Sequence, residues 1–136
     1  MKDNMMKDDR IEDISPRVVK RANDLRVFQH AYNIALVIHK ATLTFPAIEQ
    51  SALANQLRRS SKSICANIAE GFPKQKYSKA EFMRYLAIAE GSAEETRVWL
   101  KFAVDLGYMS EKLYAECVEE YNFIIGMLVN LRSKVA

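Results

Sequence analysis

Few residues of this chain have the type and spacing that catalysis or metal binding requires. The two histidines, His30 and His39, are preceded three positions earlier by Val27 and Leu36, so the Glu-x-x-His pairs of di-iron bundles are absent. The two cysteines are distant in sequence and have no nearby histidine, which excludes the usual zinc motifs. Walker A, G-x-G-x-x-G and G-x-S-x-G motifs are also missing. We therefore expect no catalytic residue, no metal site and no cofactor.

Single titratable residues on predicted helices have structural explanations. His39 falls near the centre of an apolar arc, which suggests either a buried acid–base group or, as we favour, a core histidine satisfied by a hydrogen bond. Glu90 and Glu94 lie one helical turn apart, as two metal ligands would. Because Arg97 and Lys101 continue the same strip, a solvated salt-bridge face explains the pattern better.

The strongest functional signal is positive charge gathered near the middle of the chain. Between residues 56 and 84, seven basic residues face two acidic ones, a local charge of +5 against +3 for the whole chain. The basic residues are Arg58, Arg59, Lys62, Lys74, Lys76, Lys79 and Arg84. Phe72 and Tyr77 are interleaved as candidate stacking groups for unpaired bases. We predict that these residues bind nucleic acid through contacts to its phosphates, and that salt weakens this binding. The alternative is that they form a solvated surface without a ligand.

The elements that must position these residues are helices. The 136-residue chain is 49% hydrophobic, has only 4 Gly and 3 Pro, and lacks alternating Val/Ile/Thr runs, which predicts a single all-α domain. The run from Leu53 to Gly71 predicts a central helix, because its apolar residues recur at steps of three and four. Gly71 is expected to end that helix in the left-handed conformation, just before Pro73.

Three further segments share this helical periodicity and are expected at about 24–44, at about 78–106 and from 110 onward. Asp24 is the expected N-cap of the first segment. Ser78 and Glu81 predict a capping box for the second, and Gly107 predicts a Schellman end. We therefore predict a flexible charged N-terminal arm, residues 1–23, followed by an antiparallel up-down-up-down four-helix bundle, residues 24–136.

The helix expected at about 78–106 is apolar on most of its circumference. A second set of large side chains points away from its core stripe: Ile88, Val98, Trp99, Phe102 and Leu106. A helix with two apolar sides needs two packing partners, and monomers rarely expose a large apolar patch. We predict that this second set forms the interface of a homo-oligomer.

Several of these segments resemble a known family. The run LRRSSKSICANIAEG at 57–71, LRVFQHAY at 25–32, the Phe45-Pro46 turn, YLAIAEGSAEE at 85–95 and LGY at 106–108 are similar to the bacterial four-helix bundle proteins called rRNA intervening-sequence proteins. The resemblance covers about residues 25–132. It implies a ring-like homopentamer with no established enzyme activity. A related branch, the accessory proteins of diversity-generating retroelements, implies RNA or a reverse transcriptase as partner.

We expect a noncatalytic homo-oligomeric adaptor that contacts RNA or a nucleic-acid enzyme through a basic face. The alternative is a structural or protein-interaction oligomer without nucleic-acid binding. No apolar run approaches the roughly 20 residues that cross a bilayer, and the N-terminus lacks the apolar centre of a signal peptide. We therefore expect a cytoplasmic protein with no membrane partner, whose Cys65 and Cys117 are free core residues. The sequence does not identify the cognate RNA or protein.

Overall fold

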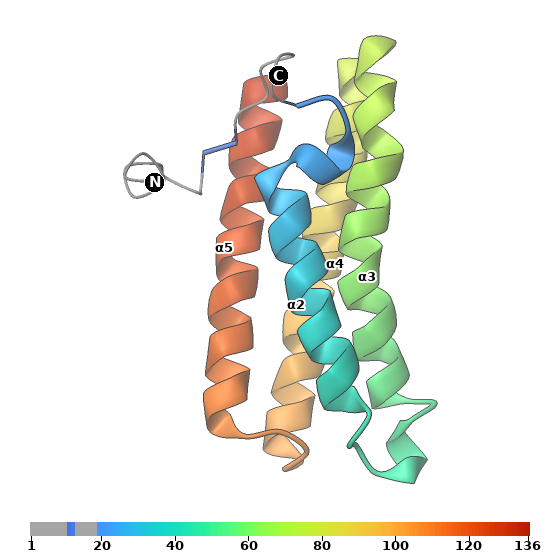
Figure 1. The fold of residues 1–136 in the computed structure, drawn as a ribbon, viewed down its shortest axis with the longest axis vertical. Coiled ribbons are helices and arrows are strands. Elements are labelled where there is room, and N and C mark those ends of the chain that lie inside the picture. The colour runs from blue at the N-terminus through green and yellow to red at the C-terminus, as the bar shows by residue number, and fades with distance from the viewer. Residues whose placement is uncertain (1–10, 13–18) are drawn as a thin grey trace.

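The computed structural model describes residues 11–12 and 19–136, in which four long helices lie side by side (Figure 1). They are α2 (Arg26–Thr42), α3 (Leu53–Gly71), α4 (Lys79–Asp105) and α5 (Glu111–Val135). Three short 3₁₀ helices accompany them: η1 (Ala22–Asp24), η2 (Ala47–Glu49) and η3 (Phe72–Lys76). No strand occurs in the described part of the chain, so the all-α prediction is confirmed.

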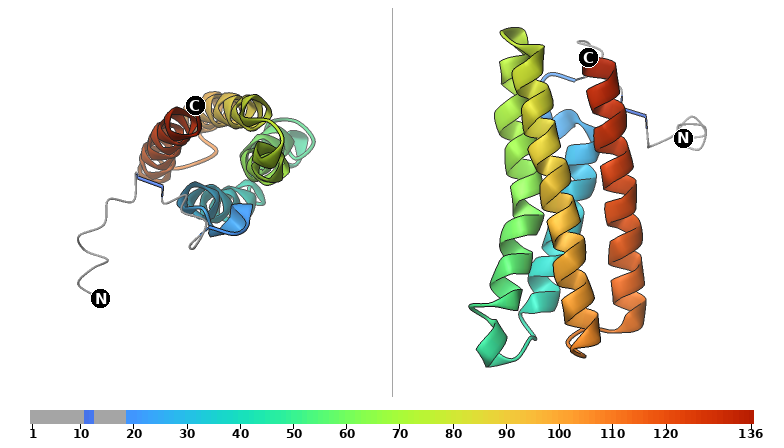
Figure 2. Two further views of the ribbon diagram at one scale, coloured as in Figure 1. Left: turned by 90° about the horizontal axis from the view of Figure 1, so that it is seen from above. Right: turned by 180° about the vertical axis from the view of Figure 1, so that it is seen from behind.

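Seen end-on, the four helices occupy the corners of a square in the order α2, α3, α4, α5, so α2 lies diagonally across from α4 (Figure 2). The α2–α3 and α4–α5 connections lie at one end of the bundle, together with η2 (Figure 1). The other end holds η1, η3 and the last turn of α5, and is termed the η3 end. Most of the predicted arm, residues 1–23, lies outside the described residues.

The core is apolar and is built from all four long helices. Its largest fully buried side chains are Leu25, Ile38, Leu57, Ile64, Ile68, Phe82, Leu86, Leu100, Tyr121, Ile124, Met127 and Leu128. The stripe predicted for the central helix is confirmed, since Leu57, Ile64 and Ile68 are at most 1% exposed. Each such side chain contributes about 1.5–3 kcal/mol of burial free energy. No helix in the described residues combines the length and apolar character needed to cross a bilayer.

Two serines begin the later helices as the sequence predicts. Ser78 Oγ accepts a 3.2 Å hydrogen bond from Glu81 N–H, and Ser110 Oγ accepts one of 3.1 Å from Leu113 N–H. The Glu81 side chain pairs with Arg84 at 3.1 Å, and this hydrogen bond is the main cause that lowers the Glu81 pKa. Of the two hydrogen bonds that make up a capping box, the one accepted by the N-cap side chain of Ser78 is thus present at the start of α4.

The end of α4 confirms the predicted Schellman motif. Gly107 has a φ of 80°, the left-handed region that glycine adopts without a Cβ clash. Tyr108 N–H donates to Ala103 O at 2.9 Å, and Gly107 N–H donates to Val104 O at 3.1 Å.

Asp24 does not cap α2, contrary to the prediction. Its carboxylate accepts 3.0 Å hydrogen bonds from the backbone N–H groups of Lys20 and Arg21. These two bonds lower the pKa of Asp24, so its charge stabilises η1 rather than α2. The N-cap position of α2 is Leu25, which has no side-chain acceptor.

The expected conformation of Gly71 is also wrong. Its φ is −80°, and the chain continues through it into η3 without a left-handed residue. Glycine is needed here for close packing, because a Cβ at position 71 would lie 2.4 Å from the Tyr85 Cβ. Gly71 therefore lets α3 approach α4 where the helices meet near the η3 end.

Candidate nucleic-acid and oligomer interfaces

The basic residues singled out in the sequence form two separate groups. Arg58, Arg59 and Lys62 lie on α3, whereas Lys74, Lys76, Lys79 and Arg84 lie on η3 and the start of α4. The helix from Lys62 to Gly71 alone spans roughly 14 Å. The structure therefore brings the second group together at the η3 end and leaves the first group along the side of the bundle.

Arg58 braces the connection between α2 and α3. Its guanidinium donates to Thr42 Oγ1 at 2.9 Å, to Gln50 O at 3.0 Å and to Gln50 Oε1 at 3.2 Å. The side chain is half-buried. Most of its donors are thus engaged within the fold, which leaves Arg58 poorly placed to bind phosphate.

Arg59 and Lys62 remain exposed on α3. Arg59 borders a shallow polar hollow that Glu95 of α4 also lines. Lys62 Nζ lies 3.1 Å from His39 Nδ1. His39 thus has the hydrogen bond that the sequence predicts, but it lies at the edge of the bundle and is only half-buried.

The group at the η3 end is organised around Tyr85. Lys74 Nζ lies 5.6 Å and the Arg84 guanidinium carbon 4.7 Å from the centroid of the Tyr85 ring, both within cation–π range. The Tyr85 hydroxyl donates to Glu70 Oε2 at 3.1 Å. Lysine and arginine side chains are therefore held at defined positions on this end.

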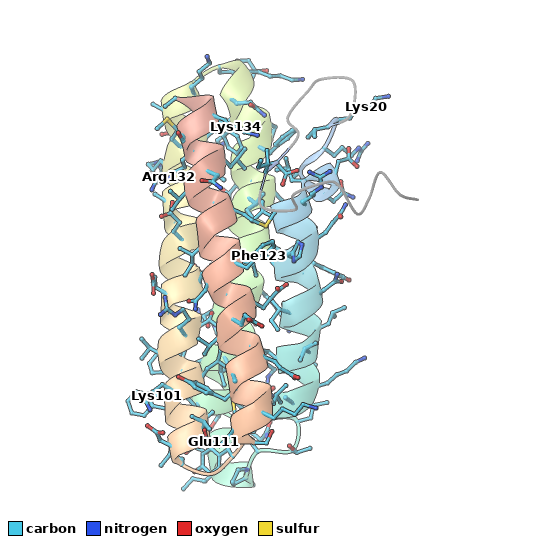
Figure 3. The ribbon with its side chains drawn as sticks, turned by 90° about the vertical axis from the view of Figure 1, so that its left-hand side faces the viewer. Lys20, Lys101, Glu111, Phe123, Arg132 and Lys134 are labelled. Atoms are coloured by element: carbon cyan, nitrogen blue, oxygen red, sulfur yellow. The ribbon has the colours of Figure 1, made fainter. Side chains whose placement is uncertain are left out.

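Further cations that the sequence analysis did not select lie at the same end. Figure 3 places Lys20, Arg132 and Lys134 at the η3 end, and Lys101 and Glu111 at the opposite end. Arg132 pairs with Glu90, and Lys134 Nζ donates to the backbone carbonyl of Glu12. These residues come from the two ends of the chain, so no local sequence pattern could connect them with residues 74–84. Exposed Lys76, Lys79 and Tyr77, the last 90% exposed, complete this surface.

The predicted oligomer interface is exposed on α4. Ile88, Val98, Phe102 and Leu106 are 40–53% exposed. Trp99 is half-buried: its ring lies 6.1 Å from that of Phe102, and its Nε1–H donates to Glu95 Oε2 at 3.0 Å. These five predicted residues are termed the α4 face. Four of these five side chains are thus exposed in a single chain, and Trp99 is partly covered.

A second apolar surface lies along α2 and its C-cap residue, Leu43. Tyr32, Leu36 and Leu43 recur at steps of four and seven and are 44–60% exposed. The sequence analysis did not predict this surface. The apolar arc of the predicted helix is wide, so the spacing of all three residues also fits buried core positions. Tyr32, Leu36 and Leu43 are termed the α2 face. α2 and α4 lie at diagonal corners of the bundle (Figure 2), so the two faces belong to two helices that are not neighbours.

The predicted salt-bridge strip on α4 is present in part. Arg97 Nη1 lies 2.9 Å from Glu94 Oε1, and Lys101 Nζ lies 3.3 Å from Asp105 Oδ2. Glu90 instead reaches across to Arg132 of α5. Within the described residues, no three or more His, Cys, Asp or Glu side chains are grouped to hold a metal ion.

Polar side chains also join α3 and α4 inside the bundle. Thr96 Oγ1 donates to Ser60 Oγ at 2.8 Å, and the hydroxyls of Ser63 and Ser92 lie 2.9 Å apart. Asn67 Nδ2 donates to Ser63 O at 2.9 Å, a hydrogen bond within α3. These polar contacts link α3 and α4 beside the apolar core.

The two cysteines are free and buried, as predicted. Burial raises the pKa of the Cys65 and Cys117 thiols to about 11. The thiolate is the reactive form, so both side chains behave as core residues and not as nucleophiles.

The described chain is thus an all-helical bundle with exposed apolar side chains on two helices and a basic end. Comparison with known families then identifies the chain: the model of the 23S rRNA-intervening sequence protein family matches residues 23–130, and the chain belongs to this family. It is similar to a crystal structure from Bacteroides thetaiotaomicron VPI-5482, described as a protein with unknown function from the S23 ribosomal protein family. The two are 28% identical with a TM-score of 0.68, over 79% of this chain and 95% of that chain. No curated protein matched the sequence.

Proposed function

We propose that this protein is a noncatalytic homo-oligomeric adaptor that contacts RNA. Its antiparallel up-down-up-down bundle would be the subunit of a ring, and the resemblance to the family suggests a homopentamer. The observation that carries the proposal is the pair of exposed apolar faces on α2 and α4, two helices at diagonal corners of the bundle.

Two different apolar faces on one subunit favour a ring over a two-fold dimer. A two-fold interface uses the same patch on both subunits, whereas a ring uses two different patches, each covered by the neighbouring subunit. The α4 face of one subunit packing on the α2 face of the next would cover both. Burying Phe102 and Leu106 against Leu36 and Leu43 of a neighbour would contribute a large part of the association free energy.

The RNA contact is proposed at the η3 end. There Lys76 and Lys79 are exposed, Lys74 and Arg84 flank Tyr85, and Tyr77 is 90% exposed. In a ring, the same end of every subunit would lie on one side, so several copies of this cationic surface would face one polyanion. Such binding is phosphate-led and weakens steeply with salt.

Light scattering of the full chain tests the assembly. We expect an oligomer for the wild type, and dissociation for Phe102→Asp and for Leu36→Asp. The matched controls are Lys101→Asp and Asn33→Asp, which place the same charge at exposed polar positions on the same helices. A monomeric wild type, or dissociation by the controls alone, would contradict the proposed ring.

Titration of nuclease-treated protein with a structured RNA at low and at physiological salt tests the second part. We expect a steep salt dependence, and loss of binding for Lys76→Glu with Lys79→Glu. Arg59→Glu with Lys62→Glu tests the α3 group in the same way, and Lys40→Glu is the control at an exposed position on α2. An oligomer that binds no RNA would favour the structural alternative.

A further inference from the structure

A hollow lies between η1 and η3, beside the basic end of the bundle. Phe28, Ala69, Phe72 and Pro73 form its apolar part, and Lys20, Arg21, Ala22 and Asn23 of the first described turn line the other side. Its volume of about 460 Å³ lies within the range of pockets that hold small organic groups. The hollow is thus large enough for a planar base, with cations along one side only.

The two aromatic rings of the hollow are held in place by neighbours. Phe28 stacks on Tyr32 with centroids 6.3 Å apart and an interplanar angle of 13°. Phe72 packs edge-on against buried Phe82, with centroids 5.8 Å apart. Both rings are half-buried, so each is anchored in the bundle and still reaches the hollow. A fixed aromatic surface accepts any base, because every base has a π face.

The cations of the hollow are presented by a fixed turn. The backbone N–H groups of Lys20 and Arg21 both donate to the Asp24 carboxylate at 3.0 Å, which leaves their side chains exposed. Asp24 is ionised and opposes part of this charge, but the turn carries two cations, Lys20 and Arg21, against this one carboxylate, which leaves it suited to phosphate.

We propose that this hollow binds one unpaired nucleotide of the RNA, with its base against Phe28 and Phe72 and its phosphate on Lys20 and Arg21. The proposal rests on the RNA binding proposed above and adds a selection for unpaired nucleotides. A base inside a duplex is stacked and paired, so it reaches such a hollow only after unstacking and unpairing. The protein would therefore prefer RNA that offers a free single-stranded segment.

The test compares two fluorescent RNAs that share one hairpin: one is blunt-ended, and the other carries a single-stranded 3′ extension. We expect the full chain to bind the extended RNA roughly tenfold more tightly, as stacking of one base predicts. Ala69→Leu should abolish this preference by filling the hollow, because Ala69 is exposed and lines it. The matched control is Ala66→Leu, also exposed on α3 but outside the lining.

A second variant keeps the test independent of the α3 substitution. Lys20→Gln with Arg21→Gln should also remove the preference, since both cations are lost while the backbone N–H groups can still donate to Asp24. Equal binding of both RNAs by the wild type, or a preference that survives Ala69→Leu, would overturn the nucleotide site and leave RNA binding intact. Failure to bind either RNA would overturn both proposals.

Discussion

The carboxylate of Glu12 accepts a 2.9 Å hydrogen bond from the backbone N–H of Val27, in the first turn of α2. Glu12 is 2% exposed, and its backbone carbonyl accepts from Lys134 Nζ near the C-terminus. The N-cap residue Leu25 has no side-chain acceptor, so Glu12 performs the capping role from fifteen residues away in the chain. Glu12 therefore links the first turn of α2 to the last turn of α5.

Replacing Glu12 should destabilise the protein. Glu12→Ala leaves Val27 N–H without its acceptor, and loss of a helix N-cap costs about 0.5–2 kcal/mol of unfolding free energy. Glu12→Gln retains a side-chain oxygen and should lose less. Urea denaturation measures both, with Glu119→Ala on the exposed surface of α5 as control. Equal stability of Glu12→Ala and the control would exclude the capping role.

Gly71 and Gly126 should respond to alanine with opposite signs. Gly71→Ala forces a Cβ to within 2.4 Å of the Tyr85 Cβ, and such overpacking costs about 1–3 kcal/mol. Gly126 has open space around the added Cβ in an exposed part of α5, so Gly126→Ala should stabilise by about 0.5–1 kcal/mol. Thermal unfolding of the two variants compares them directly. A stabilised Gly71→Ala would show that the helices separate easily at this point.

Arg58 and Arg59 should differ although they are neighbours in the sequence. Arg58→Lys removes the guanidinium that donates to both Thr42 and Gln50. Hydrogen bonds to charged groups contribute about 1.5–3 kcal/mol each, so we expect the free energy of unfolding to fall by at least about 1 kcal/mol. Arg59→Lys alters an exposed side chain and should leave stability within about 0.5 kcal/mol of the wild type. The measurement is the urea midpoint of each variant; equal midpoints would remove the bracing role of Arg58.

Features that depend on local spacing could be predicted from the sequence. The bounds Leu53–Gly71, the Ser78 and Ser110 caps and the Gly107 end follow from periodicity and from residues within one turn of a helix end. The exposure of Phe102 and Leu106 follows from the same periodicity, because one helix in a four-helix bundle cannot bury every side.

Features that join distant residues could not be predicted. Asp24 has the residue type of an N-cap, yet its carboxylate binds two earlier backbone N–H groups, and Glu12 takes the capping role. Gly71 has the position of a helix stop, but its role depends on Tyr85 of the next helix. Lys20 joins the basic end only because the chain folds back beside η3, so charge counted along the sequence missed it.

The buried thiols predict a specific loss of stability at alkaline pH. Burial raises the pKa of Cys65 and Cys117 to about 11, above the ordinary value of 9.0. Between these values the unfolded chain releases the thiol protons and the folded chain keeps them, so the thiol contribution is present below pH 9 and is lost as the pH rises toward 11. The urea midpoint of Cys65→Ala with Cys117→Ala should therefore fall less steeply than that of the wild type over this range. Parallel slopes would contradict the raised pKa values.

Tyr121 and Tyr108 should respond in opposite ways to loss of the hydroxyl. Tyr121 is fully buried, its hydroxyl has no hydrogen-bond partner among the described residues, and burial raises its pKa. Tyr121→Phe removes an unsatisfied polar group whose burial costs about 1–3 kcal/mol, so it should match or exceed the wild-type stability.

Tyr108→Phe is the matched contrast, because the Tyr108 hydroxyl donates to Glu49 Oε2 at 2.9 Å and ties the end of α4 to η2. That variant should lose about 0.5–1.5 kcal/mol. Calorimetry of both variants gives the comparison. A destabilised Tyr121→Phe would mean that the hydroxyl has a partner, and a buried water molecule bound to Tyr121 would then be the first to test.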